Sequence, residues 1–243
     1  MSKIAKCYIA VVIACGTLLT LLAAGSWSSA NLRQFVLFIG LAALASALKV
    51  RIPRMESTIS PNFAFLLLGM VALPFSQIVA ISLAAALVQS LWASAKRPRL
   101  VQVAFSAAAL LLSSGLAYEF SHLILAGSGR GSPLVCVILA GSIYLPVNSA
   151  LVSIVIGLVE GQPLKQVCAR SYEWVFPYFM VGIAFAGLVS GVFAPSAVWK
   201  GALVLLPTMV LTYVYFLNRS TRALPAMRLP APEEEEYAVE IHS

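Results

Sequence analysis

The stretch that decides the fold is FAFLLLGMVALPFSQIVAISLAAALVQSLW, Phe63–Trp92, an apolar run with a proline near its middle. One helix of about 30 residues would be about 45 Å long, whereas the hydrocarbon core of a membrane is about 30 Å thick. Proline removes a backbone hydrogen bond from a helix interior and clashes with the preceding turn. We therefore predict two short helices that meet at Pro74 as a hairpin.

Basic residues flank this hairpin on both sides. Arg54 precedes it, and Lys96, Arg97 and Arg99 follow it. Cytoplasmic loops of membrane proteins carry an excess of Lys and Arg, so both ends of the hairpin should face the cytoplasm. The two helices together then make an even number of crossings.

The remaining composition is that of a polytopic membrane protein. Of 243 residues, 60% are hydrophobic and 10% are charged, whereas soluble domains have about 45–50% apolar and about 25% charged residues. The mean hydropathy is +0.93. These values exclude a disordered protein, a nucleic-acid-binding arm and an ordinary soluble enzyme.

Six further apolar runs complete the prediction of an all-α transmembrane bundle of about eight helices. They are Cys7–Trp27, Gln34–Val50, Val101–Leu125, Leu134–Val159, Trp174–Phe193 and Ala197–Leu217. The first run could instead be a signal peptide that ends near Ser28–Ala30, but its apolar part is long for that role, which favours a retained helix. Residues 1–217 then form the transmembrane domain, and the Pro- and Glu-rich residues 218–243 form a flexible cytoplasmic tail.

The distribution of basic residues predicts the orientation of the bundle. With the N-terminus inside, thirteen of the sixteen Lys and Arg residues fall in cytoplasmic segments, and three (Arg33, Arg130 and Lys200) fall outside. This asymmetry predicts a multi-pass protein with both termini in the cytoplasm. The lipid bilayer is therefore the first expected partner, and the net charge of +7 does not indicate nucleic acid.

Four polar residues within the apolar runs are candidates for a ligand pocket. Polar groups in a membrane are costly, so each needs a partner or a function. Asn62, Gln89, Asn148 and Tyr178 could line one cavity that opens toward the cytoplasm. The competing interpretation is that they make isolated hydrogen bonds between helices.

Glu119 and His122 form a second candidate, a pH-sensitive pair. Their spacing of three residues puts them on one helix face near the outer surface. A carboxylate beside an imidazole could relay protons or respond to pH. A solvated pair at the membrane interface is the simpler interpretation.

No motif predicts an enzyme, a metal site or a cofactor. The chain contains no Asp, only two histidines, and four cysteines without the spacing of metal ligands. Gly-rich phosphate loops, GxSxG and HExxH are absent from the sequence. We expect a non-enzymatic protein without catalytic, cofactor-binding or metal-binding residues.

Four segments resemble a bacterial membrane module. They are ISPNFAFLLLGMVALPFSQIVAISLAAALVQSLW (Ile59–Trp92), KRPRLVQVAFSAAALLLSSGLA (Lys96–Ala117), YLPVNSALVSIVIGLVEG (Tyr144–Gly161) and WVFPYFM (Trp174–Met180). In motif order and hydropathy, over roughly residues 34–218, the chain resembles the multi-helix sensor module found N-terminal to HD-GYP-type phosphohydrolases and diguanylate cyclases. The resemblance implies a sensory or ligand-binding domain in the bacterial inner membrane. Residues 218–243 carry no effector motif, so the expected output is a separate protein.

Three functions fit this sequence. The first is a sensor or scaffold subunit that acts through a separate cytoplasmic or membrane partner, with room for a small-molecule ligand. The second is a small-solute binding or transport subunit that resembles the membrane component of an energy-coupling importer. The third is a structural subunit of a larger membrane complex.

Overall fold

A computed structural model describes residues 2–48, 50–51, 58–92, 98–128 and 131–223. The α-helices in these residues are α1 (Lys3–Gly25), α2 (Leu32–Ala47), α3 (Asn62–Ala72), α4 (Phe75–Leu91), α5 (Leu100–Ser128), α6 (Pro133–Glu160), α7 (Leu164–Val192) and α8 (Val198–Ala223). A short 3-10 helix, η1 (Pro195–Ala197), precedes α8. The predicted all-α helical bundle is confirmed.

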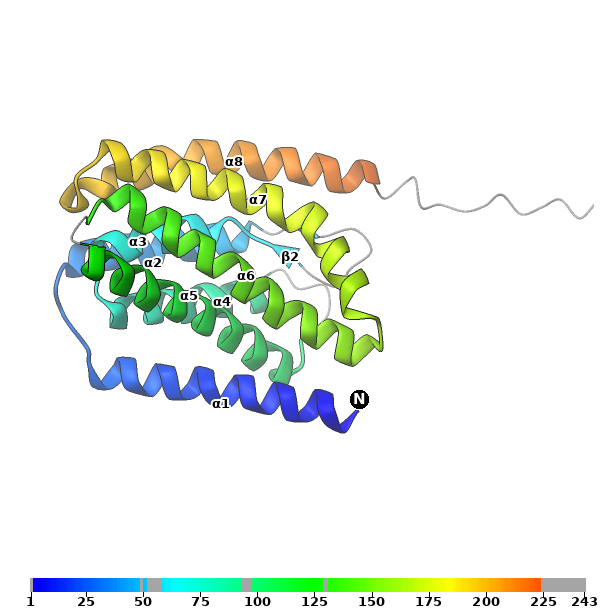
Figure 1. Ribbon diagram of the computed structural model, residues 1–243. Coiled ribbons are helices and arrows are strands. Elements are labelled where there is room, and N and C mark those ends of the chain that lie inside the picture. Colours follow the sequence, from blue (N-terminus) through cyan, green and yellow to red (C-terminus); the bar gives the residue numbers. More distant parts are fainter. Residues whose placement is uncertain (1, 49, 52–57, 93–97, 129–130, 224–243) are drawn as a thin grey trace, which may run out of the picture.

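The helices lie side by side along one common direction, with α1 at one edge of the bundle and α8 at the opposite edge (Figure 1). α1, α5, α6 and the apolar parts of α7 and α8 are long and apolar enough to cross a membrane. This fits a multi-pass integral membrane protein. The start of α1 and the last turn of α8 lie at the same end of the bundle, which we call the terminal end (Figure 1). That this end faces the cytoplasm stays a prediction.

The hairpin at Pro74 forms the centre of the bundle. α3 closes at Leu73, and Pro74 is the residue that precedes α4. α3 packs against α2, α4, α6, α7 and α8, and its residues 62–70 are all buried. Its 11 residues span only about 16 Å, so α3 by itself is too short to cross a bilayer. It is an interior helix and has no lipid-facing side.

Extended backbone precedes α3, which explains why α3 is short. β1 (Val50–Arg51) and β2 (Thr58–Ile59) pair antiparallel, with Val50 opposite Ile59 and Arg51 opposite Thr58. The segment then continues through Ser60 and Pro61, both buried, to the first residue of α3. Non-helical backbone at membrane depth is tolerated where protein surrounds it, because its amides cannot find water there. The sequence analysis did not predict this strand pair.

The loop between α1 and α2 is fixed to the hairpin at the end opposite the terminal end. The side chain of Gln77 is fully buried, and its Nε2 donates to the carbonyl oxygens of Ser28 at 2.9 Å and Ala30 at 2.6 Å. The backbone N–H of Ser28 donates to Ser76 Oγ at 3.2 Å. Asn31, at a left-handed φ of 55°, donates from Nδ2 to the carbonyl of Ala72 at 3.1 Å. These bonds hold the connection from α1 to α2 against the tip of the hairpin.

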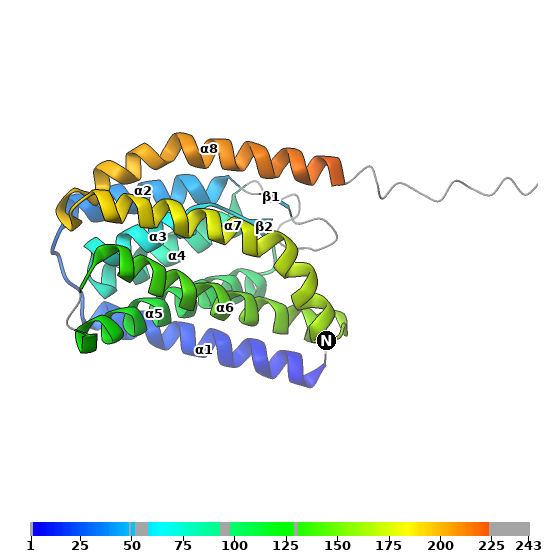
Figure 2. The same cartoon turned by 45° about the horizontal axis from the view of Figure 1, so that its top comes forward.

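Glycines let the helices approach closely. A Cβ at Gly16 on α1 would lie 2.6 Å from the Cβ of Ala108 on α5, and a Cβ at Gly182 on α7 would lie 2.0 Å from the ring of Phe63 on α3. α1 and α5 lie side by side in both overall views (Figures 1 and 2). Close backbone approach is the usual source of packing energy between membrane helices, because lipid supplies no hydrophobic drive.

Candidate ligand site between α3, α7 and α8

An aromatic cluster joins the start of α3 to α7, α6 and α8. The ring centroid of Phe63 lies 4.2 Å from that of Phe179, 5.7 Å from that of Tyr178 and 6.3 Å from that of Tyr144. The ring of Tyr178 also meets Phe216 of α8 edge-on, at 5.3 Å. Such tilted and edge-to-face contacts are the preferred arrangements of aromatic rings. The cluster fixes the position of Tyr178 from three sides.

Within this cluster the hydroxyl of Tyr178 is buried without a partner. The side chain is 3% exposed, and its hydroxyl oxygen has no hydrogen-bond partner among the described residues. Burying a hydroxyl without a hydrogen bond costs about 1–3 kcal/mol. Something absent from the protein chain itself, such as a water molecule or a ligand, is expected to satisfy this group.

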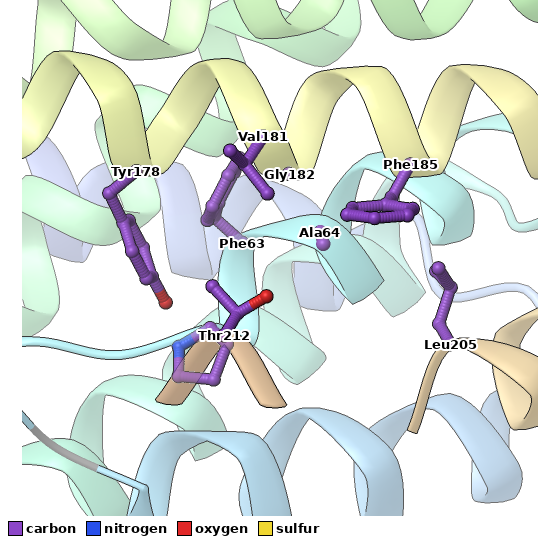
Figure 3. Close-up of a pocket in the computed structure, with 9 residues that line it drawn as sticks. Phe63, Ala64, Tyr178, Val181, Gly182, Phe185, Leu205 and Thr212 are labelled. Atoms are coloured by element: carbon purple, nitrogen blue, oxygen red, sulfur yellow. The ribbon is translucent and has the colours of Figure 1, made fainter. Parts of the chain in front are cut away.

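The hydroxyl of Tyr178 faces a narrow crevice between α3, α7 and α8. The crevice has a volume of about 20 Å³, enough for one water molecule or one oxygen-sized group. Figure 3 shows the Tyr178 hydroxyl pointing toward the side of the crevice where Thr212 lies. Its lining residues are Pro61, Phe63, Ala64, Tyr178, Val181, Gly182, Phe185, Leu205 and Thr212.

Two further features make the crevice polar at one side. Thr212 Oγ1 donates to the carbonyl of Thr208 at 2.8 Å, which leaves the oxygen of Thr212 able to accept. Pro61 and Ala64 bring the first turn of α3 to the crevice, and α3 has no side-chain cap. The first N–H groups of a helix have no partner within the helix, and they carry the positive end of its dipole.

A wider groove continues from the crevice to the surface between α7 and α8. Val181 and Thr212 line both spaces, so the crevice and the groove are contiguous. The groove has a volume of about 420 Å³, within the range of about 300–1,000 Å³ that is typical of small-molecule sites. We call it the lateral groove; its residues are Pro177, Val181, Leu211, Thr212, Tyr215, Phe216 and Arg219.

The structure brings together two of the four residues predicted to share a pocket. Asn62 is buried and donates from Nδ2 to Ser46 Oγ at 3.0 Å and to Gln89 Oε1 at 3.3 Å. These bonds connect α3 to α2 and α4. Tyr178 instead faces the crevice, on the side of α3 where Phe63 lies. Asn148, on α6, is half-buried and makes no hydrogen bond among the described residues. That all four serve one ligand stays a prediction.

Glu119 and His122 lie on α5 but make no ion pair with each other in the described part of the chain. The ring of His122 stacks on Tyr118 with 4.1 Å between the centroids. Its Nδ1 lies 2.8 Å from the carbonyl oxygen of Tyr118, which can only accept, so Nδ1 carries the proton. Glu119 is exposed. The arrangement fits an interfacial histidine that is held by its own helix.

Comparison of the chain with family models, curated proteins and solved structures gave no match. Function is therefore argued from the residues themselves. Among the described residues, no group of three or more His, Cys, Asp or Glu side chains could hold a metal ion.

Sequence reasoning missed several residues of this site. Phe63, Thr212 and Phe216 read as ordinary residues of apolar runs, and nothing in their local pattern separates them from lipid-facing neighbours. Pro177 within WVFPYFM was a usable signal, because a proline inside a helix leaves one carbonyl without its donor and often marks a functional segment. Ser46, the partner of Asn62, gave no comparable signal.

Proposed function

We propose that this chain is a non-catalytic sensor subunit of the bacterial inner membrane, which binds a ligand between α7 and α8 and acts through a separate cytoplasmic partner. One observation carries the proposal: the buried, unpartnered hydroxyl of Tyr178 at the inner end of a groove that opens sideways. A ligand that enters the lateral groove can supply the missing hydrogen bond. The resemblance to the sensor module of HD-GYP-type proteins supports the same function.

The position of α8 connects this site to an output. α8 forms one wall of the groove and continues to Ala223 at the terminal end. The residues after it, 224–243, contain the four consecutive Glu residues 233–236 and lie outside the described residues. A ligand that separates α7 from α8 changes the position from which this acidic segment is presented. A partner with a basic surface would respond to that change.

The test of ligand binding uses the purified full-length chain and a lipid extract of the native membrane as the probe. The extract should raise the thermal unfolding temperature of the delipidated protein, and Tyr178→Phe should remove most of that rise. Tyr172→Phe is the matched control, because Tyr172 is exposed and its ring stacks on Phe176 away from the crevice residues. An equal rise in wild type and Tyr178→Phe would contradict the proposal.

The test of output is native purification followed by mass spectrometry. A cytoplasmic signalling protein should co-purify with the full chain and be lost when residues 228–243 are deleted, while membrane insertion and yield stay unchanged. An ATPase pair in its place would indicate a transport subunit, and a stable multi-subunit assembly would indicate a structural role.

A small-solute binding or transport subunit is the second candidate. The polar cluster of Ser46, Asn62 and Gln89 beside the central helix favours it, since such sites often lie where a short or interrupted helix ends. In this structure both Nδ2 protons of Asn62 already have protein acceptors. A solute would have to displace these bonds, which makes the cluster the weaker site.

A further inference from the structure

The lateral groove has a polar end and an apolar end. Arg219 lies at the end toward the last turn of α8, and Leu211 lies eight residues earlier on the same helix. Eight residues of helix span about 12 Å. Between these ends the groove is lined by aromatic and aliphatic side chains and Thr212. The lining therefore suits a molecule with an apolar chain and a headgroup at the terminal end.

Two independent features favour negative charge and oxygen acceptors in that molecule. The first is the guanidinium of Arg219 at the polar end of the groove. The second is the set of donors at the crevice: the unpartnered hydroxyl of Tyr178 and the uncapped first turn of α3. A helix N-terminus and an arginine both stabilise anionic or oxygen-rich groups. Within the described residues, neither the crevice nor the groove is lined by an acidic side chain.

We propose that the occupant of the lateral groove is an anionic glycerophospholipid. One acyl chain would lie between Val181 and Leu211, the phosphate would face Arg219, and an oxygen of the glycerol-ester region would point to the crevice and accept from Tyr178. This assignment rests on the proposed function, in which the groove is the ligand site. A free phosphate would leave the apolar lining uncovered, and a neutral hydrocarbon would leave the donors without acceptors.

The experiment reconstitutes the delipidated full-length chain in nanodiscs of phosphatidylcholine and phosphatidylglycerol and measures, by native mass spectrometry, which lipid is retained. Wild type should retain phosphatidylglycerol over phosphatidylcholine about fivefold relative to the bulk ratio, the effect expected of one basic residue near the headgroups. Arg219→Gln should abolish the preference, and Arg219→Lys should keep part of it. Arg99→Gln is the matched control, because Arg99 is also at the terminal end but does not line the groove.

Tyr178→Phe should weaken retention of both lipids about fivefold, the effect of one lost hydrogen bond, without a change in their ratio. No preference in wild type, or an equal loss in Arg99→Gln, would overturn the assignment. Displacement of the lipid by millimolar inorganic phosphate would indicate a free phosphate site instead. If the native extract still stabilises wild type but not Tyr178→Phe while both lipids are retained equally, the ligand class is wrong and the proposed function stands. If Tyr178→Phe also behaves as wild type in both assays, the proposed function fails as well.

Discussion

Gly182 is the position where the smallest change should have the largest effect on this bundle. It lies on α7 opposite Phe63, and the Cβ of an alanine there would lie 2.0, 2.7 and 2.9 Å from three carbons of the Phe63 ring. Ordinary contact begins at 3.4 Å, so the ring would have to retreat by about 1.4 Å (3.4 minus 2.0). Phe63 is 2% exposed and packs against Phe179, Tyr178 and Tyr144. The ring has no free space into which it can move.

The expected cost follows from this overpacking. Forcing an extra methyl group into a well-packed core costs about 1–3 kcal/mol, whereas Ala in place of Gly in a helix by itself gains up to about 1 kcal/mol. The collision outweighs the gain, because the group that must shift is a buried ring in contact with three others. For a chain of this size the net loss corresponds to a fall of a few degrees, about 2–10 °C, in Tm.

The assay is thermal unfolding of the purified protein in detergent, read by loss of the monodisperse peak in size-exclusion chromatography. Gly191→Ala is the matched control on the same helix, because a Cβ there meets no atom within 4 Å. Its Tm should stay unchanged or rise. Combining Gly182→Ala with Phe63→Leu should be less destabilising than the sum of the two single changes, because the smaller side chain gives way. Equal Tm values for Gly182→Ala and Gly191→Ala would refute the close contact between α7 and α3.

Three further predictions concern the polar groups and the topology. Gln77→Leu should lower Tm by several degrees, because it removes two hydrogen bonds that hold the α1–α2 loop, and a cysteine introduced in that loop should then react faster with a polar maleimide. Asn62→Leu should cost more stability than Asn148→Leu in the same thermal assay, since only Asn62 has hydrogen-bond partners among the described residues, each worth about 0.6 kcal/mol in a membrane; equal losses would contradict this. Reporter fusions after Ser128 and Gln162 should read outside and inside the cell respectively, and the reverse result would invert the predicted orientation.

Much of the helix arrangement could be predicted from local pattern. The break at Pro74 separates α3 from α4 as expected, because proline limits a helix wherever it occurs. The predicted run Trp174–Phe193 began ten residues late, since α7 starts at Leu164 and includes a polar segment. α8 extends to Ala223, six residues past the predicted boundary at Leu217. Hydropathy marks the part of a helix that lies in lipid, and a helix continues into water where nothing stops it.

The candidate site could be predicted only in part. Tyr178 and Asn62 attracted attention because polar groups within apolar runs are costly. Their separation into two environments could not be foreseen, because it depends on which side of α3 each neighbouring helix occupies. Asn62 and Phe63 are adjacent in sequence, yet the first bonds to α2 and α4 while the second packs on α7.

The sequence by itself determines that this protein is a helical membrane bundle with a short central hairpin, because hydropathy, proline and basic residues act locally along the chain. Only the tertiary structure decides that α3 is enclosed on all sides, that Gln77 holds the α1–α2 loop, and that the Tyr178 hydroxyl ends at a crevice without a partner. The physical reason lies in the solvent. In water, an amphipathic pattern marks the buried face of a helix, but in a membrane the lipid-facing and protein-facing sides are both apolar. The rotation of each helix is then set by close contacts such as Gly182 against Phe63, which no periodicity in the sequence reveals.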